Sequence, residues 1–384
     1  MAVDPLGWID DEAAGWSERG LARSLRPTAG GLASLVDRDG RQLVNFASND
    51  YLGLAADPRV VRAATEAADR LGWGASASPL VSGWTDEHEA LAAELAAFEG
   101  VEAVALFPTG YAANLGALAS LVGRPDAIYS DRLNHACLID GARLSGATIR
   151  IYPHADPESL AVLLAGDEGR FRRSLIATDG VFSMDGGLAP LGLIAELATR
   201  FGAILLVDEA HGTGVFGPTG RGAAEELGVA GRVDVRVGTL SKALGSVGGF
   251  VAGSRRLVDW LINHARTLIF STASPAPAAA AARAALGLAQ GEPWRRERAR
   301  SLGKWIASEL GVPSPGGPII PVHVGEPGLA LSMAVHLADR GFLVPAIRPP
   351  TVPEGTSRLR VCLSAGHTDA QVEGLILAFR SARA

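Results

Sequence analysis

The chain has 384 residues, of which 48% are hydrophobic and 20% charged, and its formal net charge is −6. Such a length allows two or more packed domains, and such a composition is typical of a globular protein with a well-formed core. Charges of both signs are spread along the chain without a basic block, and no apolar run approaches the ~20 residues that cross a bilayer, so we expect no nucleic-acid and no membrane partner.

The N-terminal residues and the cysteines indicate where the protein resides. The first stretch, MAVDPLGWIDDEAAG, is acidic and lacks the basic and apolar regions of a secretory signal. The two cysteines, Cys137 and Cys362, have no metal-ligand spacing. We therefore expect a protein of the reducing cytoplasm.

Residues 1–45 are expected to form an N-terminal helix and hairpin segment. Residues 1–30 predict a helix with a basic tail, and Pro27 ends the pattern. The stretches GLASLVDRDG and RQLVNFAS follow as strand-like pieces, and Asp39-Gly40 between them is a hairpin signal.

From residue 46 to residue 285, short apolar runs alternate with helical patterns. The predicted strands are Ala103–Phe107, Ala127–Ser130, Thr148–Tyr152, Ser174–Thr178, Ala203–Val207, Val233–Thr239 and Gly249–Ala252. The predicted helices are Val60–Arg70, Asp86–Glu99, Asn114–Leu121, His135–Leu144, Pro157–Leu164, Gly192–Arg200 and Pro277–Gln290. Near-continuous apolar strands that alternate with helices are typical of a largely parallel sheet covered on both faces, so we predict a large α/β domain.

Residues 286–384 change in character and predict a smaller C-terminal α/β domain. The expected elements are the helices Trp294–Leu310, Leu329–Arg340 and Asp369–Ser381 and the strands Ile319–Val324 and Arg358–Leu363.

Two segments place chemistry-bearing side chains at strand ends. ILLVDEAHG ends an apolar run on Asp208 and His211, and GTLSKALG puts Lys242 in a tight Gly/Ser/Thr setting. Ligands of a parallel sheet bind beyond the carboxyl ends of its strands, and a buried carboxylate needs a cation or hydrogen-bond donors. An acid, a histidine and a lysine there suggest a pyridoxal phosphate site, with Lys242 holding the cofactor as a Schiff base. A capping or salt-bridged acid and a surface lysine remain the simpler alternatives.

A phosphate cradle is a second candidate. Pro108-Thr109-Gly110-Tyr111 follows a strand and opens a helix, whose first N–H groups can bind an anion. An ordinary strand–helix turn is the alternative. His135 follows another strand, and a single histidine at such a place is more often a hydrogen-bonded structural residue than a catalyst.

Other ligand classes fit less well. Gly212–Gly217 matches the GxGxxG pattern, but Asp208 beside it would repel a pyrophosphate, and Pro218 interrupts the following helix. No GxxxxGK[ST] loop occurs. Asp208, His211 and His135 lack the spacing of a metal site, so we expect no metal.

Seven segments, within a match from about residue 5 to the C-terminus, carry a family resemblance. They are Ala47–Leu54, Leu80–Gly83, Thr109–Asn114, Gly180–Gly186, Val207–Gly214, Thr239–Gly245 and Ile269–Thr272. In these segments the chain resembles the α-oxoamine synthases, pyridoxal phosphate enzymes of fold type I. The resemblance implies a mainly parallel large domain with a smaller C-terminal α/β domain.

The resemblance also implies roles around the cofactor ring. Lys242 would carry the cofactor and transfer protons, and Asp208 would pair with the pyridinium nitrogen. His135 would stack on the ring, and His211 and Ser183 would lie near its phenolic oxygen.

For the cofactor phosphate, the resemblance implies the backbone amides of Gly110 and Tyr111 together with Thr239. Thr272 would reach the phosphate from the neighbouring subunit, which implies a homodimer.

On the substrate side, the family pattern implies that Arg360 clamps the amino-acid carboxylate, a task that suits its planar fork. His135 would also contact substrate, and Asn49 and Arg23 would line the acyl-donor side. The implied reaction joins an amino acid to an acyl thioester with loss of CO₂ and release of the thiol. A solvated helix face is the alternative for Arg23.

Within the family, four substrate pairs are open: alanine with a pimeloyl thioester, glycine with succinyl-CoA, glycine with acetyl-CoA, and serine with a long acyl-CoA. Chain length and the Arg23 segment favour the first, with pimeloyl-CoA or a pimeloyl carrier protein as donor. The run Gly72–Pro79 departs from the family pattern near the substrate. A non-catalytic homologue that binds ligands or partners is the alternative of another class.

Overall fold

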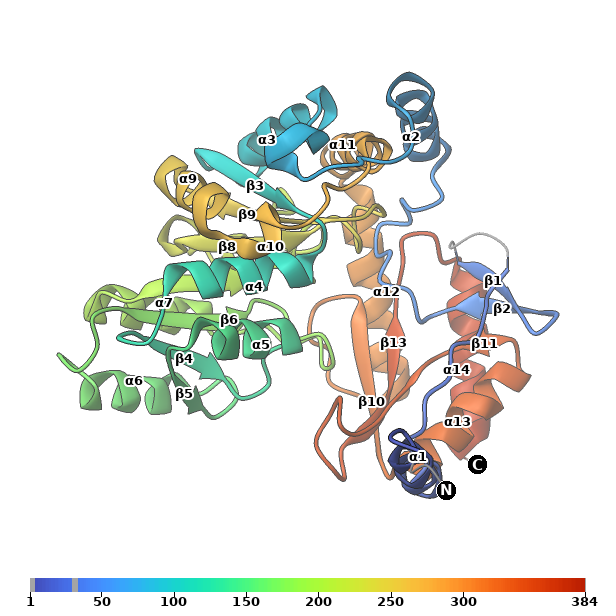
Figure 1. Ribbon diagram of the computed structural model, residues 1–384. Coiled ribbons are helices and arrows are strands. Elements are labelled where there is room, and N and C mark those ends of the chain that lie inside the picture. Colours follow the sequence, from blue (N-terminus) through green and yellow to red (C-terminus); the bar gives the residue numbers. More distant parts are fainter. Residues whose placement is uncertain (1–3, 30–33, 384) are drawn as a thin grey trace.

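The computed structural model describes residues 4–29 and 34–383 of the chain, which form a large lobe and a small lobe (Figure 1). Within these residues no helix is long and apolar enough to cross a membrane.

The large lobe is built around a seven-stranded sheet in the order β3-β9-β8-β7-β6-β4-β5. Its strands are β3 (Ala103–Phe107), β4 (Ala127–Asp131), β5 (Thr148–Tyr152), β6 (Ser174–Asp179), β7 (Ile204–Asp208), β8 (Val235–Thr239) and β9 (Gly249–Gly253). The predicted strands are confirmed, with ends that shift by one or two residues.

Helices cover both faces of this sheet (Figure 1). One core lies under α4 (Gly110–Leu121), α5 (Ala136–Ser145), α9 (Arg255–His264) and α10 (Arg266–Ile269). The other lies under α2 (Pro58–Leu71), α3 (Asp86–Glu99), α6 (Pro157–Gly166), α7 (Leu191–Phe201) and α11 (Ala276–Gly291). The short helices of the connections are η1 (Pro79–Gly83), α8 (Ala223–Glu226) and η2 (Ala230–Arg232). Covering both faces explains why the central strands are continuously apolar.

One strand of the large sheet runs against the others. β9 pairs antiparallel with both β8 and β3, whereas the remaining pairs are parallel. The connection from β8 to β9, residues 240–248, is too short for the crossover that a parallel pair requires, so the chain turns straight back. Lys242 lies on this connection.

The small lobe combines both ends of the chain. Its antiparallel sheet has the order β10-β13-β12, and a second sheet has the order β1-β2-β11. The strands are β1 (Leu35–Arg38), β2 (Arg41–Asn45), β10 (Ile319–Gly325), β11 (Phe342–Leu343), β12 (Ala346–Ile347) and β13 (Ser357–Cys362). The helices are α12 (Trp294–Leu310), α13 (Pro327–Asp339) and α14 (Asp369–Arg383). The N-terminal hairpin thus shares a sheet with a C-terminal strand.

The N-terminal helix is shorter than the sequence predicts. α1 spans Trp8–Glu18, and the prediction that it continues to Pro27 is wrong. Gly20 takes a left-handed conformation with φ +65°, and the Leu21 amide bonds back to the Trp16 carbonyl at 2.8 Å, which closes the helix. The first three residues of the predicted first hairpin piece, 31–33, lie outside the described residues.

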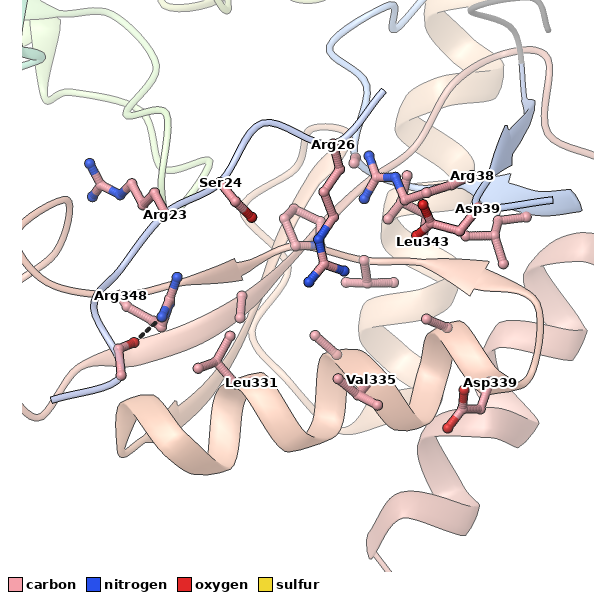
Figure 2. Close-up of a pocket in the computed structure, with 18 of the residues that line it drawn as sticks. Arg23, Ser24, Arg26, Arg38, Asp39, Leu331, Val335, Asp339, Leu343 and Arg348 are labelled. Carbon is pink, nitrogen blue, oxygen red and sulfur yellow. Dashed lines mark hydrogen bonds between the residues drawn. The ribbon is translucent and has the colours of Figure 1, made fainter. Parts of the chain in front are cut away.

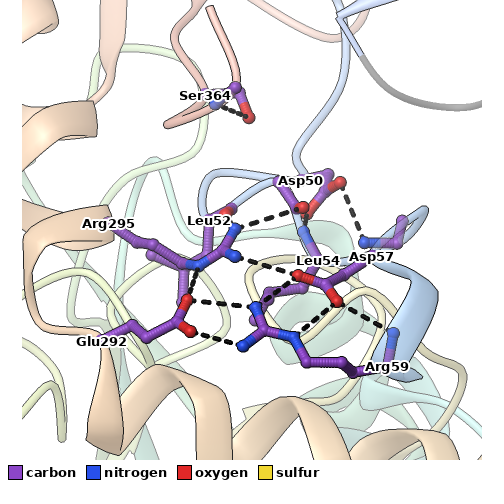
Figure 3. A network of polar contacts seen from close by, with 11 residues as sticks. Asp50, Leu52, Leu54, Asp57, Arg59, Glu292, Arg295 and Ser364 are labelled. Atoms are coloured by element: carbon purple, nitrogen blue, oxygen red, sulfur yellow. Dashed lines mark hydrogen bonds and ion pairs between the residues drawn. The ribbon is translucent and has the colours of Figure 1, made fainter.

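The lobes are joined by the short connection between α11 and α12 and by a network of polar side chains (Figure 3). Arg295 of α12 donates to the Leu52 carbonyl at 2.8 Å and to Asp57 at 2.9 Å. Glu292 accepts from Arg295 at 2.7 Å and from Arg59 at 2.5 Å. These bonds fix the segment 49–55, which enters the candidate site.

Candidate active site

Asp208 ends β7 as a buried carboxylate, 3% exposed. Its Oδ2 accepts from the Asn114 amide at 2.7 Å, and its Oδ1 accepts from the Ala210 backbone at 2.8 Å. Among the described residues, no Lys or Arg forms an ion pair with it. The salt-bridge alternative is therefore wrong for the described residues, and the carboxylate is oriented by neutral donors that leave its charge available to a cationic ligand.

Lys242 follows β8 on the tight return to β9. Within the described part of the chain its ammonium has no hydrogen bond and no ion pair. Burial lowers its pKa, against the opposing effect of Asp208, so a neutral amine forms more readily than at an exposed lysine. Gly245, three residues later, takes φ +58°, and a Cβ there would lie 2.4 Å from the Ala55 nitrogen. The lysine loop therefore packs backbone to backbone against segment 49–55.

A cradle for an anion lies at the start of α4. The Thr109 hydroxyl caps the helix by accepting from Ala112 at 3.0 Å, whereas the backbone amides of Gly110 and Tyr111 have no acceptor among the described residues. Thr239 lies directly opposite, since a Cβ on Gly110 would come within 3.2 Å of its Cβ. The structure thus brings Gly110, Tyr111 and Thr239 together as predicted, and free amides at a helix start favour phosphate.

His135 caps α5 beside the cradle. Its backbone amide donates to Asp179 at 2.7 Å, its Nδ1 accepts from the Cys137 amide at 3.2 Å, and its ring meets the Tyr111 ring edge-on at 6.5 Å between centroids. Partial burial lowers the pKa of His135. The ring is therefore mostly neutral near pH 7, as suits a group that packs against an aromatic cofactor.

Asp179 is a site residue that the sequence did not single out. It ends β6 directly beside Asp208 of β7 and orients the His135 backbone. Burial and the neighbouring Asp208 raise its pKa. The adjacent strand ends were a signal that could have identified it.

The facing wall comes from the small lobe and segment 49–55. Arg360 of β13 donates to the Ser183 carbonyl at 2.6 Å, to Asn49 Oδ1 at 3.0 Å and to the Tyr51 hydroxyl at 3.4 Å. The guanidinium is buried, and no carboxylate within the described residues pairs with it. A buried arginine that is bonded only to neutral acceptors remains available for a ligand carboxylate.

His211 lies behind this wall, with its Nδ1 2.7 Å from the hydroxyl of the fully buried Tyr51. Burial and the charges of Lys242 and Arg360 lower the pKa of His211 well below its ordinary value, so the ring is neutral. Tyr51 and Asn114 are further residues that sequence reasoning missed, because their partners lie far away along the chain.

Three predicted residues are placed differently from the rest. Ser183 contributes its carbonyl, and no bond of its hydroxyl occurs in the described structure. Thr272 is exposed between α10 and α11, and Arg23 is exposed on the N-terminal segment, where it donates to the Thr351 hydroxyl at 3.0 Å. No contact within the described residues joins Thr272 or Arg23 to the other predicted residues, so their roles remain predictions.

The arrangement fits pyridoxal phosphate. The cofactor needs donors for a dianionic phosphate, an amine for its aldehyde and an acid for its ring nitrogen. The site offers free amides at Gly110 and Tyr111, an amine at Lys242 that forms no hydrogen bond within the described chain, and a buried carboxylate at Asp208 without a cation partner. No group of three or more His, Cys, Asp or Glu side chains in the described residues is arranged to hold a metal ion.

Comparison with known proteins gives the family. The family model for aminotransferase class I and II matches residues 41–379. The chain belongs to the class I and II aminotransferase family. A curated 8-amino-7-oxononanoate synthase from Anaeromyxobacter dehalogenans is 52% identical over 383 residues, which cover 98% of this chain and 96% of the relative. The predicted resemblance to the α-oxoamine synthases within this aminotransferase family is thereby confirmed.

Solved structures confirm the predicted fold type I architecture. A serine palmitoyltransferase from S. paucimobilis with bound PLP and myriocin superposes with a TM-score of 0.92 at 30% identity, covering 99% of this chain and 98% of that one. An 8-amino-7-oxononanoate synthase from Francisella tularensis superposes with a TM-score of 0.74 at 28% identity, covering 88% and 98%. Pyridoxal phosphate is the cofactor of this aminotransferase fold, in agreement with the fit of the site.

Proposed function

We propose that this protein condenses L-alanine with a pimeloyl thioester, with loss of CO₂ and release of the free thiol, to give 8-amino-7-oxononanoate in biotin biosynthesis. The observation that carries the proposal is the 52% identity to a curated 8-amino-7-oxononanoate synthase over 98% of this chain. The protein is accordingly a pyridoxal-phosphate-dependent acyltransferase.

Arg360 binds the alanine carboxylate in this reaction. Its guanidinium is buried, and it is oriented by Asn49 and by the Ser183 carbonyl. Because both neighbours are neutral acceptors, they position the guanidinium group of Arg360 without neutralising its positive charge. A bidentate bond to the substrate would place the α-carbon between this wall and Lys242.

Lys242 removes and returns the proton at the α-carbon. Its lowered pKa supports this role, because only the neutral amine accepts a proton. Pyridoxal phosphate, when bound, supplies the electron sink that stabilises the negative charge left at that carbon. Asp208 would hold the ring nitrogen, and Gly110, Tyr111 and Thr239 would hold the phosphate.

The neighbouring groups set orientation and charge at the site. His135 would pack on the ring and contact substrate, and Asp179 holds its backbone in place at 2.7 Å. His211, kept neutral by burial, would act with Ser183 as a hydrogen-bonding partner near the phenolic oxygen. Asn49 and Arg23 would line the path of the acyl donor.

The proposed assembly is a homodimer in which Thr272 of each subunit reaches the phosphate of the other. Large apolar side chains are exposed around this segment and around η1, which supports an interface there. They are Trp73 at 71%, Val81 at 80% and Phe270 at 70% exposed. The Ala273 amide bonds to the Ala77 carbonyl at 3.0 Å, so the two segments form one surface.

A matrix of amino acids and acyl thioesters, scored by thiol release, tests the substrate pair. We expect alanine with pimeloyl-CoA or a pimeloyl carrier protein to turn over fastest. Serine with a long acyl-CoA is the serious competitor, because serine palmitoyltransferases superpose at a TM-score of 0.92. Turnover of serine or glycine pairs without turnover of alanine and pimeloyl donors would overturn the proposal, and absence of all turnover would favour a non-catalytic homologue.

A further inference from the structure

A cavity of about 800 Å³ opens on the small lobe outside the site described above (Figure 2). It lies between the N-terminal segment 20–26, the β1–β2 hairpin, helix α13 and the strands β11 and β12. Its floor is apolar, and Leu331, Val335 and Leu343 contribute to it. Both its size and its mixed lining are those of a small-molecule site.

Arginines dominate the charges of this cavity. Five arginines line it, Arg23, Arg26, Arg38, Arg41 and Arg348, against two aspartates, Asp39 and Asp339. This excess of positive charge occurs in a chain whose net charge is −6. The excess of positive charge therefore favours the binding of anions in this cavity.

Most of these arginines lack an acidic partner. Only Arg41 forms an ion pair, with Asp339 at 3.1 Å; within the described residues no carboxylate pairs with the other four. Arg38 has a buried Nε with no hydrogen-bond acceptor among the residues that the structure describes. A buried donor without an acceptor is costly, and a bound anion would relieve that cost.

Two of the arginines lie close enough to repel one another. Burial and the charge of Arg23 lower the pKa of Arg348, whose guanidinium is bonded to the Gly20 carbonyl. In Figure 2 Arg26 extends from the N-terminal segment toward the helix that carries Leu331 and Val335. The groups thus form a cationic rim above an apolar base.

The cavity adjoins the wall of the candidate active site that carries Arg360. Pro345, which lines it, accepts from the Arg360 backbone amide at 3.1 Å. Arg23 bonds to Thr351, and Thr351 and Ser183 both line a second cavity of about 50 Å³. The Ser183 carbonyl in turn accepts from Arg360. The cationic rim therefore lies close to Arg360, separated from it by the backbone bond at Pro345 and by the small cavity that Thr351 and Ser183 share.

We propose that this cavity binds the phosphorylated pantetheine arm of the acyl donor, with Arg26 and Arg38 holding the phosphate and the apolar floor supporting the arm. The inference rests on the proposed function, because it takes the donor to be a thioester of such an arm. Coenzyme A and a phosphopantetheinylated carrier protein share this chemistry. Arginine suits it because its planar fork bonds phosphate bidentately.

The test is calorimetric binding of thiol-form ligands to the cofactor-loaded full chain, without turnover. The ligands are 4′-phosphopantetheine, pantetheine lacking the phosphate, CoA, and an unacylated phosphopantetheinylated carrier protein. The variant is Arg26→Gln with Arg38→Gln. The matched control is Arg62→Gln, an exposed arginine on α2 away from the cavity. Cofactor absorbance and the melting temperature report that each variant is folded.

We expect the double variant to bind 4′-phosphopantetheine at least about tenfold more weakly, because charge-assisted bonds to the phosphate are lost. Pantetheine binding and the Arg62→Gln control should be unchanged. If CoA alone weakens, CoA is the donor that uses the cavity; if the carrier protein weakens as well, the shared phosphate is what the cavity recognises.

Two results would overturn the inference: equal affinity of wild type and double variant for every phosphorylated ligand, or no binding of any of them to the wild type. Failure of the proposed function is visible separately. It appears as absent thiol release from alanine and pimeloyl donors, whereas this binding assay involves no reaction.

Discussion

The two walls of the site are built in different ways. On the large lobe, Asp179 and Asp208 are the last residues of neighbouring strands and Lys242 lies on the loop after the next strand, so the sheet itself places them. On the opposite wall, Arg360 is held by bonds to the Ser183 carbonyl and to Asn49 and Tyr51, and the last two lie more than 300 residues away in the chain. The large lobe thus provides fixed reactive groups, whereas the other wall depends on contacts between distant segments.

This difference predicts unequal responses to mutation. Changes on the large lobe should remove chemistry and leave the fold intact. Changes on the other wall should alter substrate affinity and the mutual fit of the lobes. Four experiments test that division.

Replacement of Lys242 by alanine should have the largest effect. Loss of the proton-transferring amine predicts a fall in kcat of about 10³–10⁴-fold, at the upper end of general base catalysis. The visible absorbance of the bound cofactor should also change. Steady-state thiol release and an absorbance spectrum measure both.

Lys304→Ala is the matched control, since Lys304 is the only other lysine in the chain and is exposed on α12. It should retain wild-type kcat and spectrum. A Lys242→Ala variant with undiminished turnover would remove the large-lobe wall from the mechanism.

His367 should make the stability of the small lobe depend on pH. Its Nδ1 accepts from the Ser364 amide at 3.0 Å, its Nε2 donates to the Asn45 carbonyl at 3.0 Å, and its ring stacks on Phe46. Burial lowers the pKa of His367 from 6.5 to about 4. In the unfolded chain, His367 is therefore protonated below about pH 6.5. In the folded chain, it is protonated only below about pH 4.

The free energy of unfolding should consequently decrease as the pH falls from 6.5 to 4, by about 3 kcal/mol from this residue. Denaturant midpoints at pH 7.5 and pH 4.5 measure the change. In His367→Gln the pH dependence over this window should shrink by that amount. An unchanged slope would show that another group carries it.

Arg360→Gln should raise the KM for alanine by about 10²-fold, because a charge-assisted bidentate bond to the carboxylate is lost. The KM for the acyl donor should change little. Arg358→Gln, on the same strand but bonded to Asp185, is the comparison variant. Equal effects of the two substitutions on alanine affinity would argue against a specific clamp.

Arg295→Met should have the smallest effect. It removes the bonds that hold the Leu52 carbonyl and Asp57, and so loosens the segment that orients Arg360 (Figure 3). A rise of about fivefold in the KM for alanine with little change in kcat is expected for an indirect, positioning role.

Arg296→Met is the control for this prediction, because its bonds reach Pro218 and Ala289 and not segment 49–55. Partial recovery in Arg295→Lys would support the positioning role. A fall in kcat without a change in KM would contradict it.

The difference between the two walls of the site also explains which of its residues could be predicted from the sequence. Strand ends in a parallel sheet converge, so a local pattern sufficed to bring Gly110, Asp208 and Lys242 together. The pairing of Tyr51 with His211 spans 160 residues and has no local signature. The strand β11 has two residues, too few for any periodicity, and so the sheet β1-β2-β11 that unites the chain ends could not be foreseen.

The contact between Gly245 and Ala55 limits how the lobes can move. The lysine loop presses against segment 49–55 with no side chain between them, whereas the Arg295 side chain and the Ala365 amide bond the same segment to the small lobe. Any rotation of one lobe against the other would therefore have to be absorbed within this segment. Because the segment carries both Asn49 and Tyr51, such a rotation would disturb the supports of Arg360 and the loop of Lys242 together.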